Sequence, residues 1–468
     1  FAPLSHLGVI ILDEEHDSSF KQDQPAPCYQ ARTVAQWRAQ LANCPLILGS
    51  ATPSLESWVA ANCSTHPSIE NLPLSLALRP PVEPQSSDLP APLSPSLLVS
   101  LPHRVRDRPM PSIQVVDMRQ ELKQGNRSIF SRSLRDALQD LQTHQKQGIL
   151  FIHRRGHSTF VSCRSCGHVM ECPHCDVSLT YHQPQPGGYE SLRCHYCGYG
   201  QTHPPNCPAC GSPYLKHFGS GTQRVMEELA QQFPDLRCLR FDSDTTRAKG
   251  AHRALLTRFA EGEANLLVGT QMLTKGIDLP QVTLVGVVAA DGLLHLADYR
   301  ASERAFQTLL QVAGRAGRGE DPGHVIIQTY SPQHLVIEAV VRQDYAAFAA
   351  SELQYREDLH YPPYGQLVLL RISGMDLNTV RQTAEEISAR LRQILEQTDG
   401  SQTSHSSSYQ VLGPAAAAIA RVARRHRWQI LLKRLSDRPS PLPDLTELRS
   451  HCPSSISLTI DVDPLNLS

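Results

Sequence analysis

The sequence predicts an α/β fold with two lobes built on parallel sheets, a cysteine-rich insertion in the second lobe and a C-terminal α+β domain. Short apolar runs alternate with helical segments along much of the 468-residue chain, which is the order found in parallel sheets with helices on their faces. Eight of the 13 cysteines fall between Cys163 and Cys210 as four CxxC pairs. Such pairs are typical of metal-binding modules, so we expect a small module that interrupts the second lobe.

Net charge, length and the lack of long apolar runs limit the class of protein. The chain carries 44 Lys and Arg against 45 Asp and Glu, a net charge of -1, so any basic surface for nucleic acid has to be local. Its length predicts two or three domains. The sequence contains neither a run of about 18 apolar residues nor a charged-then-apolar leader, so we expect no membrane contact and a cytoplasmic location.

The part of the first lobe in this chain opens on GVIILDEEHD at residues 8–17. Its apolar run predicts a strand buried on both faces, and Asp13 and Glu14 follow at the carboxyl end, where open α/β sheets bind ligands. In nucleotide hydrolases an Asp at this place holds Mg²⁺ beneath a triphosphate, together with a glycine-rich phosphate loop. No GxxxxGK[ST] occurs in the chain, and Phe1 stands only a few residues before the strand. We therefore expect that the chain starts within a domain and that the phosphate loop lies upstream.

The rest of the first lobe is short. A helix over 31–41 and an apolar strand in PLILGSATPS, residues 45–54, complete it, and we expect it to end near residue 60. Residues 79–112 are rich in Pro and Ser and show no periodicity, which is typical of a segment without a packed core. We therefore assign 61–128 as an inter-lobe linker.

The second lobe is predicted over 129–340, with the cysteine module 163–210 inserted in it. Its elements alternate as strand and helix: strands at 148–153, 237–242, 265–269, 282–288 and 324–330, with helices that include 221–233 and 301–314. The C-terminal domain, 341–468, reads as strand, helix, strand, strand, helix and strand, an order that resembles a split βαβ domain.

The spacing of the cysteines predicts two four-thiolate zinc sites. Cys175 and Cys194 are separated by 18 residues, which fits the spacing of a zinc ribbon and pairs the inner knuckles. The five residues between the first two knuckles leave little room for those two to share an ion. The expected sites are Cys163, Cys166, Cys207 and Cys210 for zinc 1, and Cys172, Cys175, Cys194 and Cys197 for zinc 2. A disulfide framework is the alternative, which an intracellular α/β protein disfavours, and closed four-thiolate sites serve folding rather than catalysis.

Four other motifs have ordinary explanations when each is taken alone. DEEH fits an exposed acidic turn, SAT a strand-to-loop turn, GTQMLTKG a glycine turn after a buried strand, and QVAGRAGR a helix end with a basic face. In this order across two α/β lobes they resemble the superfamily 2 helicases, which have two RecA-like lobes, the first of them partial here. With the zinc knuckles, HRRGH, FDSDTT, YPPYG, RWQILLK and DVDP, the chain resembles the bacterial replication-restart helicases of the primosomal protein N′ (PriA) family.

The resemblance implies ATP-dependent 3′-to-5′ DNA unwinding and loading of the replicative helicase at stalled or repaired forks. It implies ATP, Mg²⁺ and two Zn²⁺ as cofactors. Its implied partners are forked and single-stranded DNA, primosome proteins, the replicative helicase and its loader, and single-stranded DNA-binding protein, within the nucleoid. Because the phosphate loop of the family lies upstream, this chain alone is expected to be inactive.

The resemblance also assigns residues. Asp13 would hold Mg²⁺ through water, Glu14 would orient or deprotonate the attacking water, and Arg315 and Arg318 would reach the γ-phosphate. The residues expected to couple nucleotide state to the DNA path are His16, Ser50, Thr52, Lys275 and Gln311. Two positions depart from the family pattern: Ile277 stands where His is common, and Ala289 where an acid is common.

Two surfaces are candidates for contact with DNA. Near the C-terminus Arg424, Arg425 and Arg427 surround Trp428, so the arginines would meet phosphates and the indole a base. The alternative is a solvated basic strand edge with the Trp in the core. On the zinc module we expect an exposed basic and aromatic set for DNA or a partner protein: Arg164, His168, His174, His182, Arg193, His195 and Tyr196.

Two other functions remain open. Besides a motor, the protein could be a fork-binding restart scaffold that does not hydrolyse ATP, or a zinc-ribbon nucleic-acid binder unrelated to motors. The α/β lobes disfavour the third. A scaffold has no physical reason to keep Glu14 or Arg315, so the intact DEEH and GRAGR motifs favour the motor.

Overall fold

The structure is a computed structural model, and it falls into two units that are described separately. Unit 1 comprises residues 1–100, 195–198 and 349–468, and unit 2 comprises residues 101–194 and 199–348. The structure describes residues 4, 6–22, 28–63, 97–101, 104, 107–153, 160–175, 177–182, 190–217, 222–242, 245, 246, 248, 250–274, 278–399, 408–435, 442 and 444–467. None of the helices in these ranges is both long and apolar enough to cross a membrane.

Unit 2 is built on a six-stranded sheet in which every neighbouring pair is parallel, in the order β10-β11-β4-β12-β13-β3. The strands are β3 (Ser112–Asp117), β4 (Gln147–Ile152), β10 (Cys238–Phe241), β11 (Leu266–Gly269), β12 (Val282–Val288) and β13 (His324–Thr329). β4 and β11 are buried along their whole length, as expected for central strands covered on both faces. The α/β class predicted for this part of the chain is confirmed.

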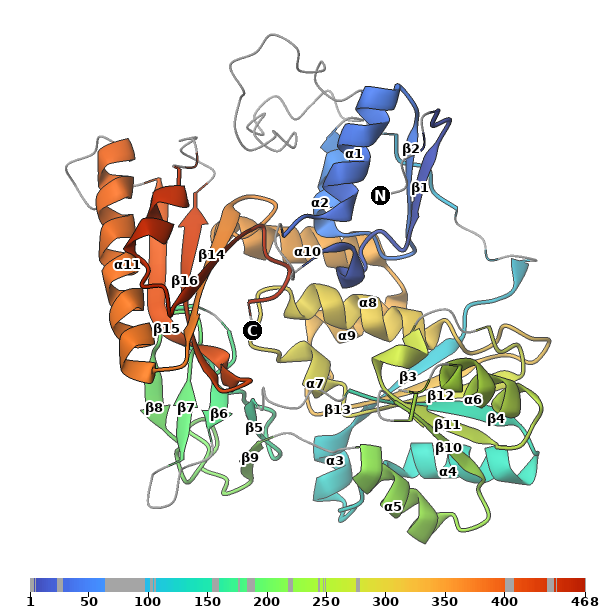
Figure 1. The fold of residues 1–468 in the computed structure, drawn as a ribbon. Coiled ribbons are helices and arrows are strands. Elements are labelled where there is room, and N and C mark those ends of the chain that lie inside the picture. The colour runs from blue at the N-terminus through green and yellow to red at the C-terminus, as the bar shows by residue number, and fades with distance from the viewer. Residues whose placement is uncertain are drawn as a thin grey trace. The chain divides into compact units, whose positions relative to one another are not determined.

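Helices cover both faces of this sheet (Figure 1). One core forms beneath α4 (Arg132–Thr143) and α5 (Thr222–Gln232). The opposite core forms beneath α6 (Ala251–Ala260), α8 (Ala301–Ala313) and α9 (Leu335–Arg342). The short elements η4 (Gln271–Thr274) and α7 (Asp291–Leu294) follow β11 and β12. The motifs after these strands therefore lie at the carboxyl ends of a doubly wound sheet.

The segment 112–123 differs from its assignment to the linker. It forms β3 and α3 (Met118–Lys123), and β3 pairs with β13 from Ser112 opposite His324 to Asp117 opposite Thr329. Val116 is buried in the core. The run SIQVVD is a short alternating strand that directly follows a proline-rich stretch, so its sequence signal is weak.

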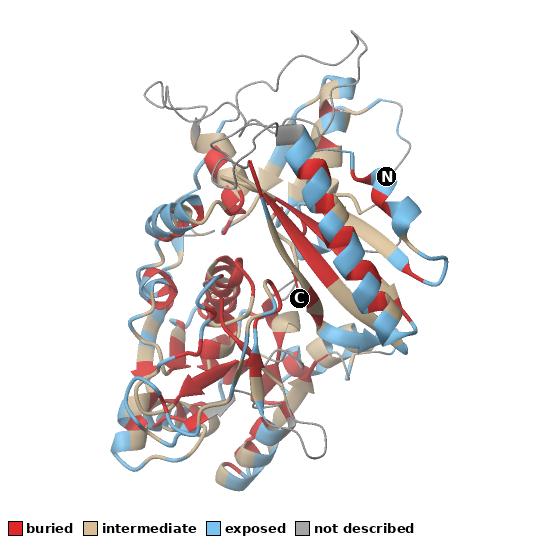
Figure 2. Ribbon diagram, turned by 90° about the vertical axis from the view of Figure 1, so that its left-hand side faces the viewer, coloured by how far each residue is buried: buried red, intermediate tan, exposed pale blue. Residues whose placement is uncertain are grey.

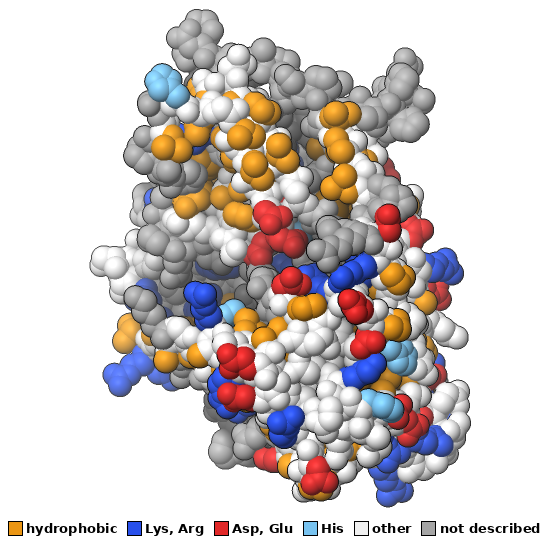
Figure 3. All heavy atoms as spheres, turned by 90° about the vertical axis from the view of Figure 1, so that its right-hand side faces the viewer, with side chains coloured by type: hydrophobic (Ala, Val, Ile, Leu, Met, Phe, Trp, Pro, Cys, Tyr) orange, Lys and Arg blue, Asp and Glu red, His pale blue; other side chains and the backbone are white. Residues whose placement is uncertain are grey.

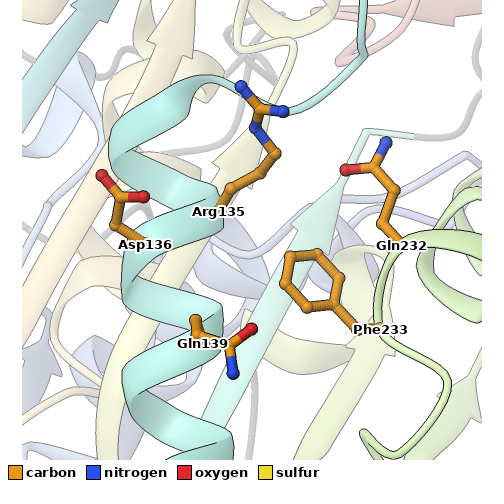
Figure 4. Close-up of a pocket in the computed structure, with 5 residues that line it drawn as sticks. All are labelled: Arg135, Asp136, Gln139, Gln232 and Phe233. Carbon is orange, nitrogen blue, oxygen red and sulfur yellow. The ribbon is translucent and has the colours of Figure 1, made fainter.

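A hollow of about 530 Å³ opens between α4 and the end of α5 in unit 2. Arg135, Asp136 and Gln139 line it from α4, and Gln232 and Phe233 line it from the other side (Figure 4). The lining is mainly polar, and none of the sequence motifs contributes to it.

The cysteine module consists of short antiparallel strands. β5 (Val161–Cys163) pairs with β9 (Leu215–His217), and β7 (Ser191–Arg193) lies between β6 (Thr180–His182) and β8 (Gly200–Thr202). The module begins after β4 and ends before α5, so it is inserted between a strand and a helix of the α/β fold of unit 2.

In unit 1 the N-terminal part contains the parallel pair β1 (Ile10–Asp13) and β2 (Leu46–Gly49), with α1 (Ala31–Ala42) and α2 (Leu55–Cys63). The expectation that β1 is buried on both faces was wrong. Its burial alternates along the strand, and Ile11 and Ile47 are 62% and 50% exposed. α1 packs against these strands, whereas within the described ranges no helix covers the other side. Hydrophobic side chains gather in the upper part of the face drawn in Figure 3.

The C-terminal part of unit 1 follows α10 (Tyr345–Asp358) and has an antiparallel sheet in the order β15-β16-β14-β17. Its elements are β14 (Gln366–Gly374), α11 (Leu377–Asp399), β15 (Tyr409–Val422), β16 (Arg425–Arg434), η5 (Thr446–His451) and β17 (Ser457–Val462). This is the strand order of a split βαβ domain, although the last predicted helix is a 3-10 helix. Figure 2 shows α11 striped by buried and exposed residues, since one side of it packs on the sheet.

Two partly buried histidines lie beyond the carboxyl ends of β12 and β13. His295 follows α7 and His334 caps α9, and the two rings meet edge to face with 5.7 Å between centroids. Burial lowers the pKa of His295 to about 4. Burial and then the charge of His295 lower the pKa of His334 to about 4. Both rings are therefore neutral in the folded protein near pH 7.

We expect this pair to make the chain less stable in mild acid. In the unfolded chain both rings bind protons as the pH falls below 6.5, whereas in the folded chain they do so only near pH 4. Their stabilising contribution is complete above pH 6.5 and is lost as the pH falls towards 4, by up to about 1.4 kcal/mol per pH unit for each histidine. Urea unfolding at pH 7, 5.5 and 4.5 measures this. His295→Gln with His334→Gln should flatten the dependence, whereas the exposed His144→Gln should leave it unchanged; equal slopes in all three proteins would contradict the assignment.

Candidate functional site

The eight knuckle cysteines gather in two groups. Within each group the four sulfur atoms lie within 4.8 Å of one another. The groups are Cys163, Cys166, Cys207 and Cys210, and Cys172, Cys175, Cys194 and Cys197. These are the two sets that the sequence pairs. In the first, the Sγ atoms of Cys163 and Cys210 are 3.6 Å apart, and those of Cys166 and Cys207 are 3.7 Å apart. Four sulfurs at about 2.3 Å from one tetrahedral zinc ion would stand at nearly this spacing.

The pKa values of the cysteines in the outer group also fit a bound cation. Burial opposes ionisation of Cys163, but the N–H groups of Cys166 and Ser165 and the thiol of Cys210 lower its pKa to about 7. Burial, followed by the neighbouring thiols, raises the pKa of Cys166 to about 12. Without a metal one thiolate forms readily and the next resists, so four thiolates need a bound cation to hold them together.

Three knuckles have a glycine directly after the second cysteine. Gly167, Gly198 and Gly211 have φ values of 84°, 82° and 70°, a region that favours glycine because it lacks a Cβ. The N–H of Gly167 donates to the Cys163 carbonyl at 2.8 Å, and that of Gly211 to the Cys207 carbonyl at 2.8 Å. The CxxCG pattern therefore encodes the turn that points both sulfur atoms toward one centre.

The outer group is fixed to the six-stranded sheet of unit 2. Arg119, just after β3, donates from Nη1 to the Cys166 carbonyl oxygen at 3.2 Å, and its guanidinium also pairs with Asp117 at 2.8 Å. A Cβ on Gly167 would lie 2.7 Å from the carbonyl oxygen of Tyr330, which follows β13. The first knuckle thus lies directly against the carboxyl ends of β3 and β13.

The last part of the inner group packs on the C-terminal sheet within unit 1. His195 Nδ1 lies 3.0 Å from the Ala416 carbonyl oxygen, and Gln429 Nε2 donates to the His195 carbonyl oxygen at 2.8 Å. His195 and Tyr196 are buried, so the expectation that they form an exposed surface was wrong. His168, His174 and Arg193 are exposed. Burial of His195 and Tyr196 depends on β15 and β16, which lie more than 200 residues away in the sequence. No local sequence pattern therefore shows it.

The acidic motif ends β1 in unit 1. Asp13 and Glu14 are both exposed, Glu14 has a φ of 50°, and its N–H donates to Asp13 Oδ1 at 3.0 Å. Both carboxylates stand at the carboxyl end of a parallel strand, where they reach solvent. Oxygen ligands so placed suit Mg²⁺ and its water molecules.

A continuous set of contacts joins this motif to SAT. Glu14 Oε2 lies 3.6 Å from His16 Nδ1, which lies 2.7 Å from Ser50 Oγ. The N–H of Thr52 donates to the same hydroxyl at 2.9 Å. The structure therefore brings together the three residues of unit 1 that were expected to couple nucleotide state to the DNA path.

Sequence reasoning gave no role to Glu15. Its side chain is buried, pairs with Arg32 at 2.7 Å, and accepts from the N–H of Ser54 at 2.6 Å and the hydroxyl of Ser57 at 3.0 Å. It ties the acidic motif to the start of α2. Two adjacent glutamates look alike in the sequence, and only the fold shows that one is exposed and the other buried.

The GRAGR motif follows α8 in unit 2. Arg315 is buried and donates to the carbonyl oxygen of Thr274, the last residue of η4. Arg318 is partly exposed and donates to the Gly314 carbonyl at 3.0 Å and to Asp278 at 3.1 Å. Gln311 is partly buried on the last turn of α8. Lys275 and Ile277 lie outside the described residues.

The basic cluster near the C-terminus is a hairpin tip. β15 and β16 are joined by Ala423 and Arg424, with φ values of 47° and 66°, so the chain turns in two residues and Arg424 is exposed. Arg425 donates to the Ser373 carbonyl at 2.9 Å. Burial and then Arg371 lower the pKa of Arg427. Trp428 is partly buried against the core beneath α11, which leaves the tip as the candidate for phosphate contact.

A parallel sheet with the GTQ and GRAGR motifs beyond its strands, interrupted by a cysteine module, defines the second lobe of a zinc-containing helicase. Three family models match: the helicase conserved C-terminal domain over 217–320, the PriA DNA helicase Cys-rich region over 172–201, and the primosomal protein N C-terminal domain over 357–465. The chain belongs to the PriA family of replication restart proteins.

Comparison with its relatives shows how much of their length this chain covers. The chain is 58% identical over 467 residues to the replication restart protein PriA of Synechocystis sp., covering 100% of this chain and 52% of that protein. It is 44% identical over 433 residues to that of Bacillus subtilis, covering 92% and 48%. The chain thus spans about half the length of these relatives. Among solved structures, S. cerevisiae Dbp5 bound to RNA and ADP BeF3 matches at 12% identity and a TM-score of 0.35, over 73% of this chain and 58% of that one.

We expect elemental analysis of the purified chain to return two zinc ions. Each group supplies four sulfur atoms at the spacing of one ion, and such sites are closed. Cys163→Ser with Cys166→Ser should leave one ion, as should Cys172→Ser with Cys175→Ser. Cys238→Ser, which belongs to neither group, is the matched control and should leave two. A wild-type chain with one zinc would overturn the assignment.

Proposed function

We propose that this chain forms part of the first lobe, the second lobe and the C-terminal domain of an ATP-dependent 3′-to-5′ DNA helicase of the replication-restart primosome. The helicase recognises stalled or repaired forks and promotes loading of the replicative helicase. The observation that carries the proposal is the joined set Asp13, Glu14, His16 and Ser50 in unit 1, together with the buried Arg315 in unit 2. A fork-binding scaffold needs none of these side chains in such an arrangement.

The proposed division of the chain follows its elements. Residues 1–60 end the first lobe, 61–128 link the lobes, 129–340 form the second lobe around the zinc module 163–210, and 341–468 form the DNA-binding domain. β3, although within 61–128, belongs to the sheet of the second lobe. The proposed partners are forked and single-stranded DNA, the replicative helicase with its loader, primosome proteins and single-stranded DNA-binding protein, in the cytoplasm at the nucleoid.

When bound with ATP, Mg²⁺ would supply charge neutralisation at the phosphates. Asp13, at the end of β1, would hold that ion. Glu14 accepts a proton from the attacking water, and His16 and Ser50 link its position to Thr52 and the start of α2. Arg315 and Arg318 place positive charge where negative charge develops on the γ-phosphate.

We expect the 468-residue chain by itself to hydrolyse essentially no ATP, because its sequence has no GxxxxGK[ST] loop to hold the phosphates. The full-length protein should hydrolyse ATP when single-stranded DNA is added and should unwind a duplex with a 3′ single-stranded tail. A phosphate-release assay with and without DNA measures both proteins. DNA-stimulated turnover by the 468-residue chain would refute the first expectation, and a full-length protein that binds forks without hydrolysis would favour the scaffold.

A further inference from the structure

The C-terminal sheet has a second face, opposite α11, whose polar side chains are met by other segments of unit 1. Gln429 donates to the carbonyl oxygen of His195, and the ammonium of Lys433 lies 3.9 Å from the centroid of the Tyr361 ring. Asp461 on β17 pairs with Lys21 at 2.8 Å. This face is therefore an internal docking surface, and one of the segments held on it comes from the loop after the acidic motif.

The contact between Lys21 and Asp461 is deeply buried. Their side chains are 4% and 1% exposed. Lys21 Nζ also donates to the Val462 carbonyl oxygen at 2.9 Å. Among the described residues, Lys21 is the cation that pairs with the Asp461 carboxylate, so its ammonium balances that charge. A buried pair of this kind depends on both partners, because either charge left alone in the interior is unfavourable.

A short run of hydrogen-bonded turns joins Lys21 to the acidic motif. The N–H of Asp17 donates to the Glu14 carbonyl at 2.8 Å, and the Asp17 side chain caps the 3-10 helix η1 (Ser18–Phe20). The N–H of Lys21 then donates to the Ser18 carbonyl at 3.2 Å. Each step from Glu14 to Lys21 is fixed by a local bond, so a displacement at one end is transmitted to the other.

We infer that Lys21 and Asp461 form a positioning contact through which the C-terminal domain holds Asp13 and Glu14 in place for nucleotide hydrolysis. The inference rests on the proposed function and deepens it, because it gives the C-terminal domain a part in ATP turnover that is separate from binding DNA. The pair is therefore assigned a positioning role and not a catalytic one. It acts by fixing the far end of the loop whose near end carries the two carboxylates.

The test compares variants of the full-length protein. Lys21→Met should lower kcat for ATP at saturating single-stranded DNA by on the order of tenfold or more, since small misplacements of catalytic groups have large effects on rate. The KM for ATP and the Kd for single-stranded DNA should change by less than about twofold, because the phosphate-binding and DNA-binding groups remain. Exchanging the partners, Lys21→Asp with Asp461→Lys, should recover much of kcat, whereas each exchange alone should not.

The matched control is the ion pair between Arg390 and Glu447 in the same domain, whose side chains are 37% and 51% exposed. Arg390→Ala should leave kcat unchanged. If Lys21→Met does not fold, Lys21→Met with Asp461→Leu leaves no buried charge and carries the same comparison. A wild-type kcat in a folded Lys21 variant overturns the inference, as does a fall in kcat matched by an equal loss of DNA affinity. Absence of DNA-stimulated hydrolysis in the wild-type protein would instead refute the proposed function.

Discussion

Glu14→Gln in the full-length protein is expected to lower DNA-stimulated ATP turnover by about 10²- to 10⁴-fold, the usual range for loss of a positioned general base. Glu14 is exposed beyond β1 and lies 3.6 Å from His16, so its carboxylate is both accessible and held in direction. Glutamine has the same size but accepts no proton. Nucleotide binding should persist, because Asp13 and the phosphate-binding groups remain.

The measurement is steady-state phosphate release with single-stranded DNA, alongside binding of a fluorescent nucleotide. The neighbouring Glu15→Gln is the matched control. Glu15 is buried against Arg32 and Ser54, so this change should lower the free energy of unfolding by about 1–3 kcal/mol and leave most turnover intact while the protein is folded. More than a tenth of wild-type turnover in Glu14→Gln would show that another group activates the water.

The second large effect is expected from Cys172→Ser with Cys175→Ser, which removes two ligands from the inner group. The module spans about 48 residues from Cys163 to Cys210, too few for a sufficient apolar core, so bound metal has to supply its stability. The inner ribbon should unfold locally, and the contact of His195 with Gln429 and Ala416 on the C-terminal sheet should be lost with it. We expect DNA-dependent ATP hydrolysis in the full-length protein to fall much less than unwinding and loading of the replicative helicase.

Zinc content, circular dichroism and parallel ATPase and unwinding assays measure this result. The outer pair, Cys163→Ser with Cys166→Ser, provides a comparison, because that knuckle lies against β3 and β13 through Arg119 and Tyr330. Its loss should disturb the motor sheet and reduce hydrolysis as well. Equal losses of hydrolysis and unwinding in the inner variant, with unchanged circular dichroism, would mean that the inner ribbon is part of the motor.

The strands of the second lobe were predictable because each is an apolar run bounded by polar turns, and a central parallel strand such as β4 needs nothing else to mark it. The knuckles were predictable because each CxxC pair and the spacing between pairs are local features of the sequence. β3 and η5 were missed or mistyped. β3 is an edge strand that is identified by its pairing with β13 and not by its own sequence. η5 is a short 3-10 helix, and so short a helix resembles a turn of α-helix in sequence.

By itself the sequence determined the order of elements, the metal-binding pairs and the family, since these depend on neighbouring residues and on spacing along the chain. Only the tertiary structure decided which side chains are buried and by what. Trp428 lies against the core beneath α11, His195 lies against β15 and β16, and Glu15 is enclosed while Glu14 is not. Lys21 donates to a carbonyl 441 positions away. No local periodicity encodes such contacts, because burial depends on the surface that folding brings opposite a side chain.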